Sequence, residues 1–307
     1  TAIEHVAGKA RIAAVVGRTF DTRTVAAVSD LSIDVVVDAL DAAIAANLVL
    51  EEPGRAVRLT FTHALVQQVL IEELSVTRRA RLHERVGDTI AASAGDDPAL
   101  LREAALHLLA AAPFDTVERA IRLVRRSDDL SDLRTPVETL AMVALVERAV
   151  ADAETPPSED LALVLVAAAV AAFTNSDRAA VGDYAARAVA AARAVGADRA
   201  FARAVAIGSQ ATGFGLDLRF LPLVPEALQR VGDDLTARVG LMSQAHMAAC
   251  MFADGSDPRS RTETLVTVIA ELMERPSPTI EDLKSQALGL GMAPWGYLPD
   301  PDLARMT

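Results

Sequence analysis

Five histidines are the first side chains in this sequence to consider for chemistry: His5, His63, His83, His107 and His246. A zinc hydrolase would place two of them in H-E-x-x-H on one helix face, and that spacing does not occur. His107, in ALHLLAAA, is interpreted as a helix-face residue. The single cysteine, Cys250, cannot form an internal disulfide, and no Cys/His cluster has metal-ligand spacing. The sequence therefore predicts no metal site and favours a reducing, cytoplasmic setting.

Phosphate-binding and nucleophile motifs are also missing. A P-loop requires G-x-x-x-x-G-K-[ST], but the only Gly-Lys pair, Gly8-Lys9, has Ile3 at the first glycine position and Ala10 after the lysine. GFGLDL at Gly213 lacks the third glycine and the preceding strand of a dinucleotide fingerprint, so we interpret it as a loop between helices. No G-x-S-x-G sequence marks a nucleophilic serine. We expect no active site in this chain.

The composition indicates that helices must position whatever the chain binds. Ala supplies about a fifth of the 307 residues and aromatic residues only 4%. Because Ala is the best helix former and aromatic residues favour strands, we predict a mostly-α fold. The net charge of -12 disfavours nonspecific nucleic-acid binding, which depends on basic residues. The longest apolar run, LALVLVAAAVAAF at residues 161–173, is shorter than the roughly 20 residues of a membrane span and is expected to be a buried helix.

The first third of the chain has a mixed pattern. EHVAGKARIAAVVGRTF has helical spacing and ends near Gly17, a suitable C-cap, and Asp21 and Ser32 are suitable N-caps for two further helices. LVLEEPGRAVRLTF consists of two apolar runs around Pro53 and Gly54, which is typical of a β-hairpin. Three helices, a hairpin and another helix are the order of a winged-helix domain, which we assign to residues 1–95.

The remainder, residues 96–307, is predicted to be helical throughout. Apolar spacing places helices at roughly 98–112, 115–127, 131–152, 159–173, 177–195, 198–212, 217–231, 233–252, 259–274 and 279–290. VGADRAFAR at Val195 and VGDDLTAR at Val231 match with an offset of 36 residues, and each ends one helix and opens the next. Such a period is typical of tetratricopeptide-like repeats, so we predict an α-helical repeat region, truncated at its end. A less regular helical bundle is the alternative.

Charged residues near helix starts have ordinary explanations. Asp96-Asp97 and Asp233-Asp234 are expected to cap helices, because carboxylates favour the positive end of the helix dipole. The helix after the hairpin region contains a basic cluster: Arg78, Arg79, Arg81 and Arg85. This cluster either contacts nucleic acid or, as we favour, forms a solvated face paired with acidic neighbours: Glu72, Glu73 and Glu84.

The third helix argues against DNA recognition by the winged helix. It would be the recognition helix of a DNA-binding member, yet it carries Asp34, Asp38 and Asp41 and no Arg or Lys. Residues 1–95 contain ten Lys and Arg residues against twelve Asp and Glu residues. Direct DNA binding by this chain is therefore not expected.

Residues 10–92 carry several landmarks of a known family. AAVVGRTFDTRTVAAVSDLSIDVVVDALDAAIAANLVLEE and LTFTHALVQQVLIEELSVTRRARLHERV resemble the segment after the ATPase core in STAND-type regulators of bacteria. These are the LuxR-type large ATP-binding transcriptional activators and related actinobacterial proteins that join a nucleotide cyclase to the same ATPase. Only Lys9 and Lys284 among the 30 basic residues are Lys, a bias that fits a GC-rich bacterial source.

The resemblance implies a role for His63. In the family, the histidine that opens the helix after the hairpin resembles one that contacts the phosphates of bound ADP and holds the closed, inactive state. His63 is the matching residue, and Thr62 is expected to cap the helix, whose free N–H groups attract phosphate. Thr62 stands where the family has Arg, and Ile71 where it has Tyr. A structural role, with the ring of His63 bonded to a backbone carbonyl, is the alternative.

The resemblance also implies a function. The chain is expected to be a non-catalytic fragment of a signal-transduction ATPase that regulates transcription or cyclic-nucleotide synthesis. ATP or ADP would bind the upstream ATPase domain of the same chain, and no cofactor is expected in this chain itself. The helical repeats would bind an inducer or a partner protein, without membrane contact. Whether the parent carries a DNA-binding helix-turn-helix or a cyclase stays open, and the alternative function is a helical-repeat scaffold without nucleotide linkage.

Overall fold

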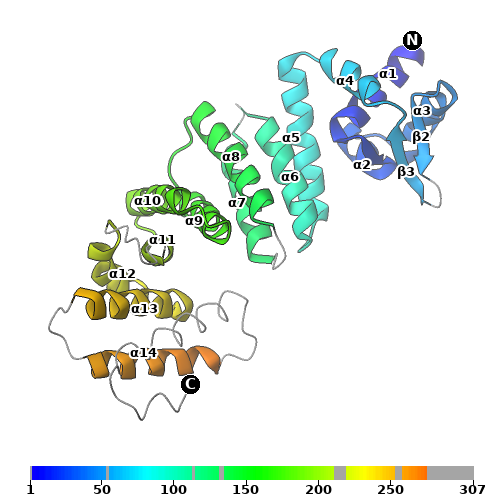
Figure 1. The fold of residues 1–307 in the computed structure, drawn as a ribbon. Helices are drawn as coiled ribbons and strands as arrows, with labels where there is room; N and C mark the ends of the chain where they lie inside the picture. Colours follow the sequence, from blue (N-terminus) through cyan, green and yellow to red (C-terminus); the bar gives the residue numbers. More distant parts are fainter. Residues whose placement is uncertain are drawn as a thin grey trace. The chain divides into compact units, whose positions relative to one another are not determined.

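The computed structural model describes most of the chain, namely residues 2–52, 55–112, 115–130, 135–210, 219–252 and 258–274. It is mostly helical (78%) with a small three-stranded antiparallel sheet, which confirms the prediction of a mostly-α fold (Figure 1). None of the described helices combines the length and the apolar character needed to cross a membrane. The predicted turn at Pro53 and Gly54, the loop at Gly213 and the predicted helix at 279–290 lie outside the described residues.

The chain forms two compact units. Unit 1 comprises Thr1–Ser131 with Ala144–Thr155, and unit 2 comprises Asp132–Val143 with Pro156–Thr307. The predicted boundary lies instead at residue 95, between the winged-helix pattern and the helical remainder. That division stays a prediction.

Unit 1 begins with helices that surround the sheet and continues with helices that pack on one another. Its elements are α1 (Ala2–Val16), β1 (Thr19–Asp21), α2 (Thr22–Ser29), α3 (Ile33–Ala45), β2 (Val49–Glu52), β3 (Arg55–Phe61), α4 (Ala64–Glu72), α5 (Val76–Ser93), α6 (Pro98–Ala110) and α7 (Val117–Leu130). The N–H of Gly17 donates to the Ala13 carbonyl (3.2 Å) where α1 ends, and the Asp21 carboxylate accepts from the Arg23 N–H (2.7 Å) where α2 begins. Both ends are as predicted. Ser32 occupies the N-cap position of α3, but its side chain makes no capping hydrogen bond, contrary to expectation.

The sheet contains one strand more than the predicted two-stranded hairpin. The predicted hairpin is present, with β2 antiparallel to β3 and Val49 opposite Phe61. β1 pairs with the other edge of β3, placing Phe20 opposite Leu59, so the strand order is β1-β3-β2. A three-residue strand is too short to show an alternating pattern, and only its pairing with β3 identifies it.

The core of unit 1 lies between the sheet and its surrounding helices. Phe20 and Phe61 are 2% and 1% exposed, and their ring centroids are 5.4 Å apart. The predicted apolar face of α5 packs into the same core through three buried residues: Leu82, Val86 and Ile90. The hydrophobic effect therefore joins the sheet to α5 in one continuous core.

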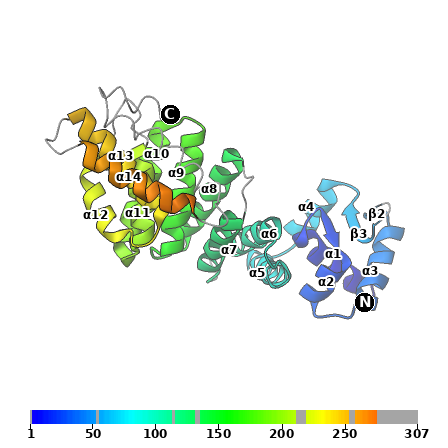
Figure 2. The same cartoon turned by 90° about the horizontal axis from the view of Figure 1, so that it is seen from below.

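Helices α5 and α6 approach each other closely, side by side in both views (Figures 1 and 2). Gly87 of α5 makes this approach possible. A Cβ atom at Gly87 would lie 2.8 Å from Cδ2 of Leu108 and 3.0 Å from the backbone oxygen of Ala104, both on α6. A side chain at this position would require Leu108 or the backbone of α6 to shift.

The helices from α8 onward follow in sequence as α8 (Pro136–Asp152), α9 (Glu159–Thr174), α10 (Arg178–Val195), α11 (Asp198–Gln210), η1 (Leu221–Leu223), α12 (Val224–Arg230), α13 (Leu235–Phe252) and α14 (Pro258–Met273). The division between the units falls within α8. Ten residues of α9 are buried, which confirms the prediction of a buried helix. The predicted helix at 217–231 is instead a 3-10 turn followed by the short α12. Pro222 and Pro225 lack the N–H groups that a longer α-helix would need.

Helix pairs recur in unit 2. α11 packs against α9, α10, α12 and α13, so each pair contacts the next. Gly196 (φ 67°) ends α10 and Gly232 (φ 54°) follows α12, both in the left-handed conformation that glycine adopts readily. Both copies of the VG motif therefore end a helix, as predicted.

Ion pairs link the two junctions that carry this motif. Asp234 caps α13 by accepting from the Ala237 N–H (3.1 Å), and it also contacts Nε of Arg203 on α11 (3.0 Å). Arg230, at the end of α12, contacts Asp198 at the start of α11 (3.2 Å). Asp97 caps α6 in the same way as Asp234 caps α13, so both acidic pairs supply a cap as expected.

Candidate functional site

His63 lies directly between β3 and α4. It is exposed, occupies the N-cap position with extended backbone (φ -133°, ψ 138°), and its side chain makes no capping hydrogen bond. Its carbonyl accepts the Val66 N–H (3.0 Å), but within the described part of the chain its ring bonds to no backbone carbonyl. The structural alternative for His63 therefore finds no support here, and the phosphate contact stays a prediction.

Thr62 does not cap α4, contrary to expectation. Its hydroxyl donates toward the carbonyl oxygens of Asn47 and Leu48, each 3.0 Å away, and its N–H donates to Leu48 (3.1 Å). Pairing of β2 with β3 places Thr62 beside the residues that precede β2, so its hydroxyl finds carbonyls there first. The N-terminus of α4 is left without a side-chain cap.

Helix α4 has one side on the core and one side open. Three partly buried residues form the inner side: Val66, Leu70 and Ile71. On the opposite side Leu65 is 68% and Val69 46% exposed, one helical turn apart, and Val76 at the start of α5 is 72% exposed. We call the two exposed apolar residues of α4, Leu65 and Val69, together with His63, the α4 face. Exposed apolar groups next to one another favour contact with another protein surface.

Two arginines of the basic cluster on α5 form ion pairs within the chain. Arg81 contacts Glu84 (2.8 Å), the predicted acidic partner, whereas Arg85 reaches Asp30 beyond the end of α2. The prediction that the basic cluster also pairs with Glu72 and Glu73 is wrong. Those residues face other partners, because Glu73 binds Arg11 (2.7 Å) and Glu72 accepts from Gln68 (2.8 Å).

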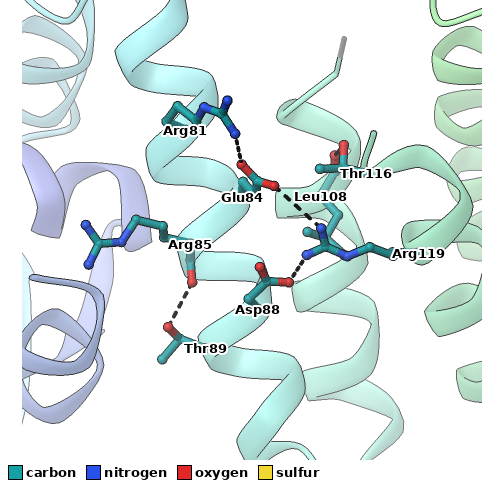
Figure 3. Close-up of polar contacts among 8 residues, drawn as sticks. All are labelled: Arg81, Glu84, Arg85, Asp88, Thr89, Leu108, Thr116 and Arg119. Atoms are coloured by element: carbon teal, nitrogen blue, oxygen red, sulfur yellow. Dashed lines mark hydrogen bonds and ion pairs between the residues drawn. The ribbon is translucent and has the colours of Figure 1, made fainter. Parts of the chain in front are cut away.

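Acidic residues of α5 also bind α7. Glu84 and Asp88 are one turn apart, so both carboxylates point to the same side and meet Arg119 of α7 (Figure 3). Thr116 donates to the Leu108 carbonyl (2.8 Å) at the junction of α6 and α7. These contacts hold helices together, and exposed pairs of this kind contribute about 0.2–1 kcal/mol each.

The third helix exposes its acidic side. Asp34, Asp38 and Asp41 are all exposed, while Val36 and Leu40 are buried on the opposite side. Three carboxylates facing phosphates would repel DNA. The expectation that α3 does not read DNA stays a prediction.

Two histidines that are far apart in the sequence lie together. Nδ1 of His83 on α5 is 2.9 Å from Nδ1 of His107 on α6, and the ring centroids are 5.2 Å apart. Burial, the His107 ring and Arg79 lower the pKa of His83 to about 4. Burial also lowers the pKa of His107, although a hydrogen bond with the Val16 backbone opposes that effect. His107 is on a helix face as predicted, but the sequence contains no sign of its partner.

The remaining described histidine with a shifted pKa is in unit 2. His246 of α13 is 1% exposed, and burial followed by the charge of Arg261 lowers its pKa. Among the residues that the structure describes, no three His, Cys, Asp or Glu side chains lie close enough to hold a metal ion.

Comparison with protein-family models, curated proteins and solved structures found no match to this chain. What the chain does must therefore be inferred from its own residues.

Proposed function

We propose that this chain is a non-catalytic part of a cytoplasmic signal-transduction ATPase of the STAND type. In this proposal residues 1–95 are a winged-helix domain that couples nucleotide state to a helical-repeat sensor. The α4 face is the observation that carries it: an exposed histidine precedes exposed apolar residues on a helix whose other side rests on the core. The uncapped N–H groups of α4 favour an anion, and the apolar residues favour contact with another domain. ATP or ADP is bound by the upstream ATPase domain, and His63 contacts its phosphates.

The order of elements supports the winged-helix part of the proposal. α1, α2 and α3 precede the β2–β3 hairpin, which corresponds to the wing, and β1 completes the sheet. Direct DNA binding by α3 is not part of the proposal, because its exposed side is acidic.

The helix pairs of unit 2 support a tetratricopeptide-like sensor. The first helices of the three pairs, α9, α11 and α13, begin at Glu159, Asp198 and Leu235, so the pairs recur at intervals near the period of such repeats. We propose that these repeats bind an inducer or a partner protein. Binding would shift the populations of closed and open states of the parent protein by its differential affinity for the two states.

The test is a substitution in the parent protein that contains the ATPase domain. His63→Ala removes one hydrogen bond to a charged phosphate, so ADP should bind roughly 10- to 100-fold more weakly, or basal activity should rise. Thr77→Ala, also exposed but on α5, is the matched control and should change neither quantity. Unchanged ADP affinity and unchanged basal activity in His63→Ala would remove the sensing role.

A helical-repeat scaffold without nucleotide linkage is the second candidate. The linked helix pairs of unit 2 favour it, since such repeats bind partners without any nucleotide. A P-loop sequence upstream of residue 1 supports the switch, and its absence from the complete reading frame supports the scaffold.

A further inference from the structure

The close pair of histidines can hold only one proton between its facing nitrogens. Nδ1 of His83 and Nδ1 of His107 are 2.9 Å apart, which is a hydrogen-bond distance and requires one donor and one acceptor. If both rings are protonated, both nitrogens are donors and two positive charges face each other in a half-buried site. The hydrogen bond between α5 and α6 is then lost.

We propose that the His83–His107 pair is a proton-sensitive latch between α5 and α6, closed when at most one ring is charged and open when both are. The latch acts within unit 1 and requires no nucleotide, so it goes beyond the function proposed above. Its position is set by Gly87, one turn from His83, which lets α6 approach closely.

The charged groups around the latch do not compensate a second proton. On α5, Arg79 adds positive charge, and Glu84 is bound to Arg81 and Arg119. Two other carboxylates on neighbouring elements also face arginines: Asp30 beyond α2 faces Arg85, and Asp88 on α5 faces Arg119. Burial raises the pKa of Glu103 on α6, an effect that the charge of Arg58 opposes. α1 contributes the buried Lys9 and the Val16 backbone, which forms a hydrogen bond with His107. α7 contributes Arg119.

The sign of the pH dependence follows from these surroundings. In the opened state each imidazole is solvated and takes its ordinary pKa of 6.5, whereas burial, His107 and Arg79 lower the pKa of His83 to about 4 when closed. The opened state therefore binds more protons between these values, and opening becomes more favourable as the pH falls from about 6.5 toward 4. Above pH 7 the latch is closed.

Opening should have local consequences. α5 contacts α1, α2 and α6, and ion pairs join it to α7. Loss of the bond between α5 and α6 would loosen this helical part of unit 1, while α9 and α10, which contain no histidine, would be unaffected.

Hydrogen exchange of the complete chain at pH 7 and pH 5, corrected for intrinsic rates, tests the latch. The lowered pKa of His83 makes opening at pH 5 at most roughly twentyfold more favourable than at pH 7, and solvent screening of the partly exposed ring reduces this factor. Peptides from α5 and α6 should therefore exchange several-fold faster at pH 5, and peptides from α9 and α10 should not. In His83→Asn, whose amide replaces Nδ1 but does not titrate, the acceleration should fall below about twofold. Thr77→Asn, exposed on the same helix, is the matched control and should behave like the wild type.

Two results would overturn the latch: equal acceleration in α5–α6 and α9–α10, or an undiminished acceleration in His83→Asn. If the variant does not fold, the wild-type imidazole signals give the answer by NMR titration. The rings of His83 and His107 should then titrate below the ordinary value and as a coupled pair. Independent titration of these two rings near pH 6.5 would reject the proposal.

Discussion

Gly87→Ala tests whether the approach of α5 to α6 depends on a missing side chain. Gly87 is in the interior of α5, and a Cβ atom there would lie 2.8 Å from Cδ2 and 2.9 Å from Cγ of Leu108. The side chain of Leu108 can shift, but the Ala104 backbone oxygen, 3.0 Å away, moves only if α6 moves. Gly8, in the interior of α1, is the matched control, because a Cβ there meets nothing within 4 Å.

The expected magnitude comes from the difference between the two variants. Replacing Gly by Ala in a helix interior stabilises the helix by up to about 1 kcal/mol, and this gain is common to both positions. Overpacking at Gly87 adds a cost of about 1–3 kcal/mol. Gly8→Ala should therefore raise the free energy of unfolding of unit 1 slightly, and Gly87→Ala should be less stable than Gly8→Ala by about 1–3 kcal/mol.

Urea unfolding followed by pulsed hydrogen exchange measures this difference, because it reports peptides of unit 1 separately from those of unit 2. Both variants lie in unit 1, so the same peptides serve for both. The reasoning is refuted if Gly87→Ala is as stable as Gly8→Ala, since the two helices would then have room for a methyl group.

Three further predictions concern the core, a cap and DNA. Phe61→Ala should cost about 3–5 kcal/mol in urea unfolding, whereas Phe173→Ala, at a 47% exposed site, should cost far less. Burial alone would raise the pKa of Asp234, but Arg203, the Ala237 N–H and Arg199 hold it below its ordinary value of 3.8. Its charge thus stabilises unit 2 above that pH. Asp234→Asn keeps a capping side chain but loses the ion pairs with Arg203 and Arg199, so it should cost about 1 kcal/mol at pH 7 and less as the pH falls below 3.8. A gel-shift at low salt should show no DNA association. Salt-sensitive DNA binding would contradict the inference that the exposed carboxylates of α3 prevent DNA binding.

Much of the local structure was predictable because its signals are local. Apolar spacing identified most of the described helices, although not the break between η1 and α12, and the two apolar runs on either side of Pro53 and Gly54 identified the β2–β3 hairpin. The caps at Asp21, Asp97 and Asp234 depend only on residues within three positions of each cap.

The candidate site was predictable in part. The resemblance to STAND-type regulators indicates His63 as a candidate site residue. The structure places this histidine, exposed, at the start of α4. The prediction that Thr62 caps α4 was wrong. A hydroxyl has several acceptors within reach, and the pairing of β2 with β3 decides which of them the Thr62 hydroxyl meets. The open side of α4 was not predicted, since helical spacing does not show which side the core covers.

The sequence by itself determined that this chain is mostly helical, that it contains a hairpin and that α9 is buried, since these follow from composition or from residues that are neighbours in the chain. Only the tertiary structure decided which distant residues meet. It pairs β1 with β3, and it joins His83 to His107 across 24 positions of the chain. That second contact depends on how closely two helices cross at Gly87, and the distance between helices is set by packing of the whole core.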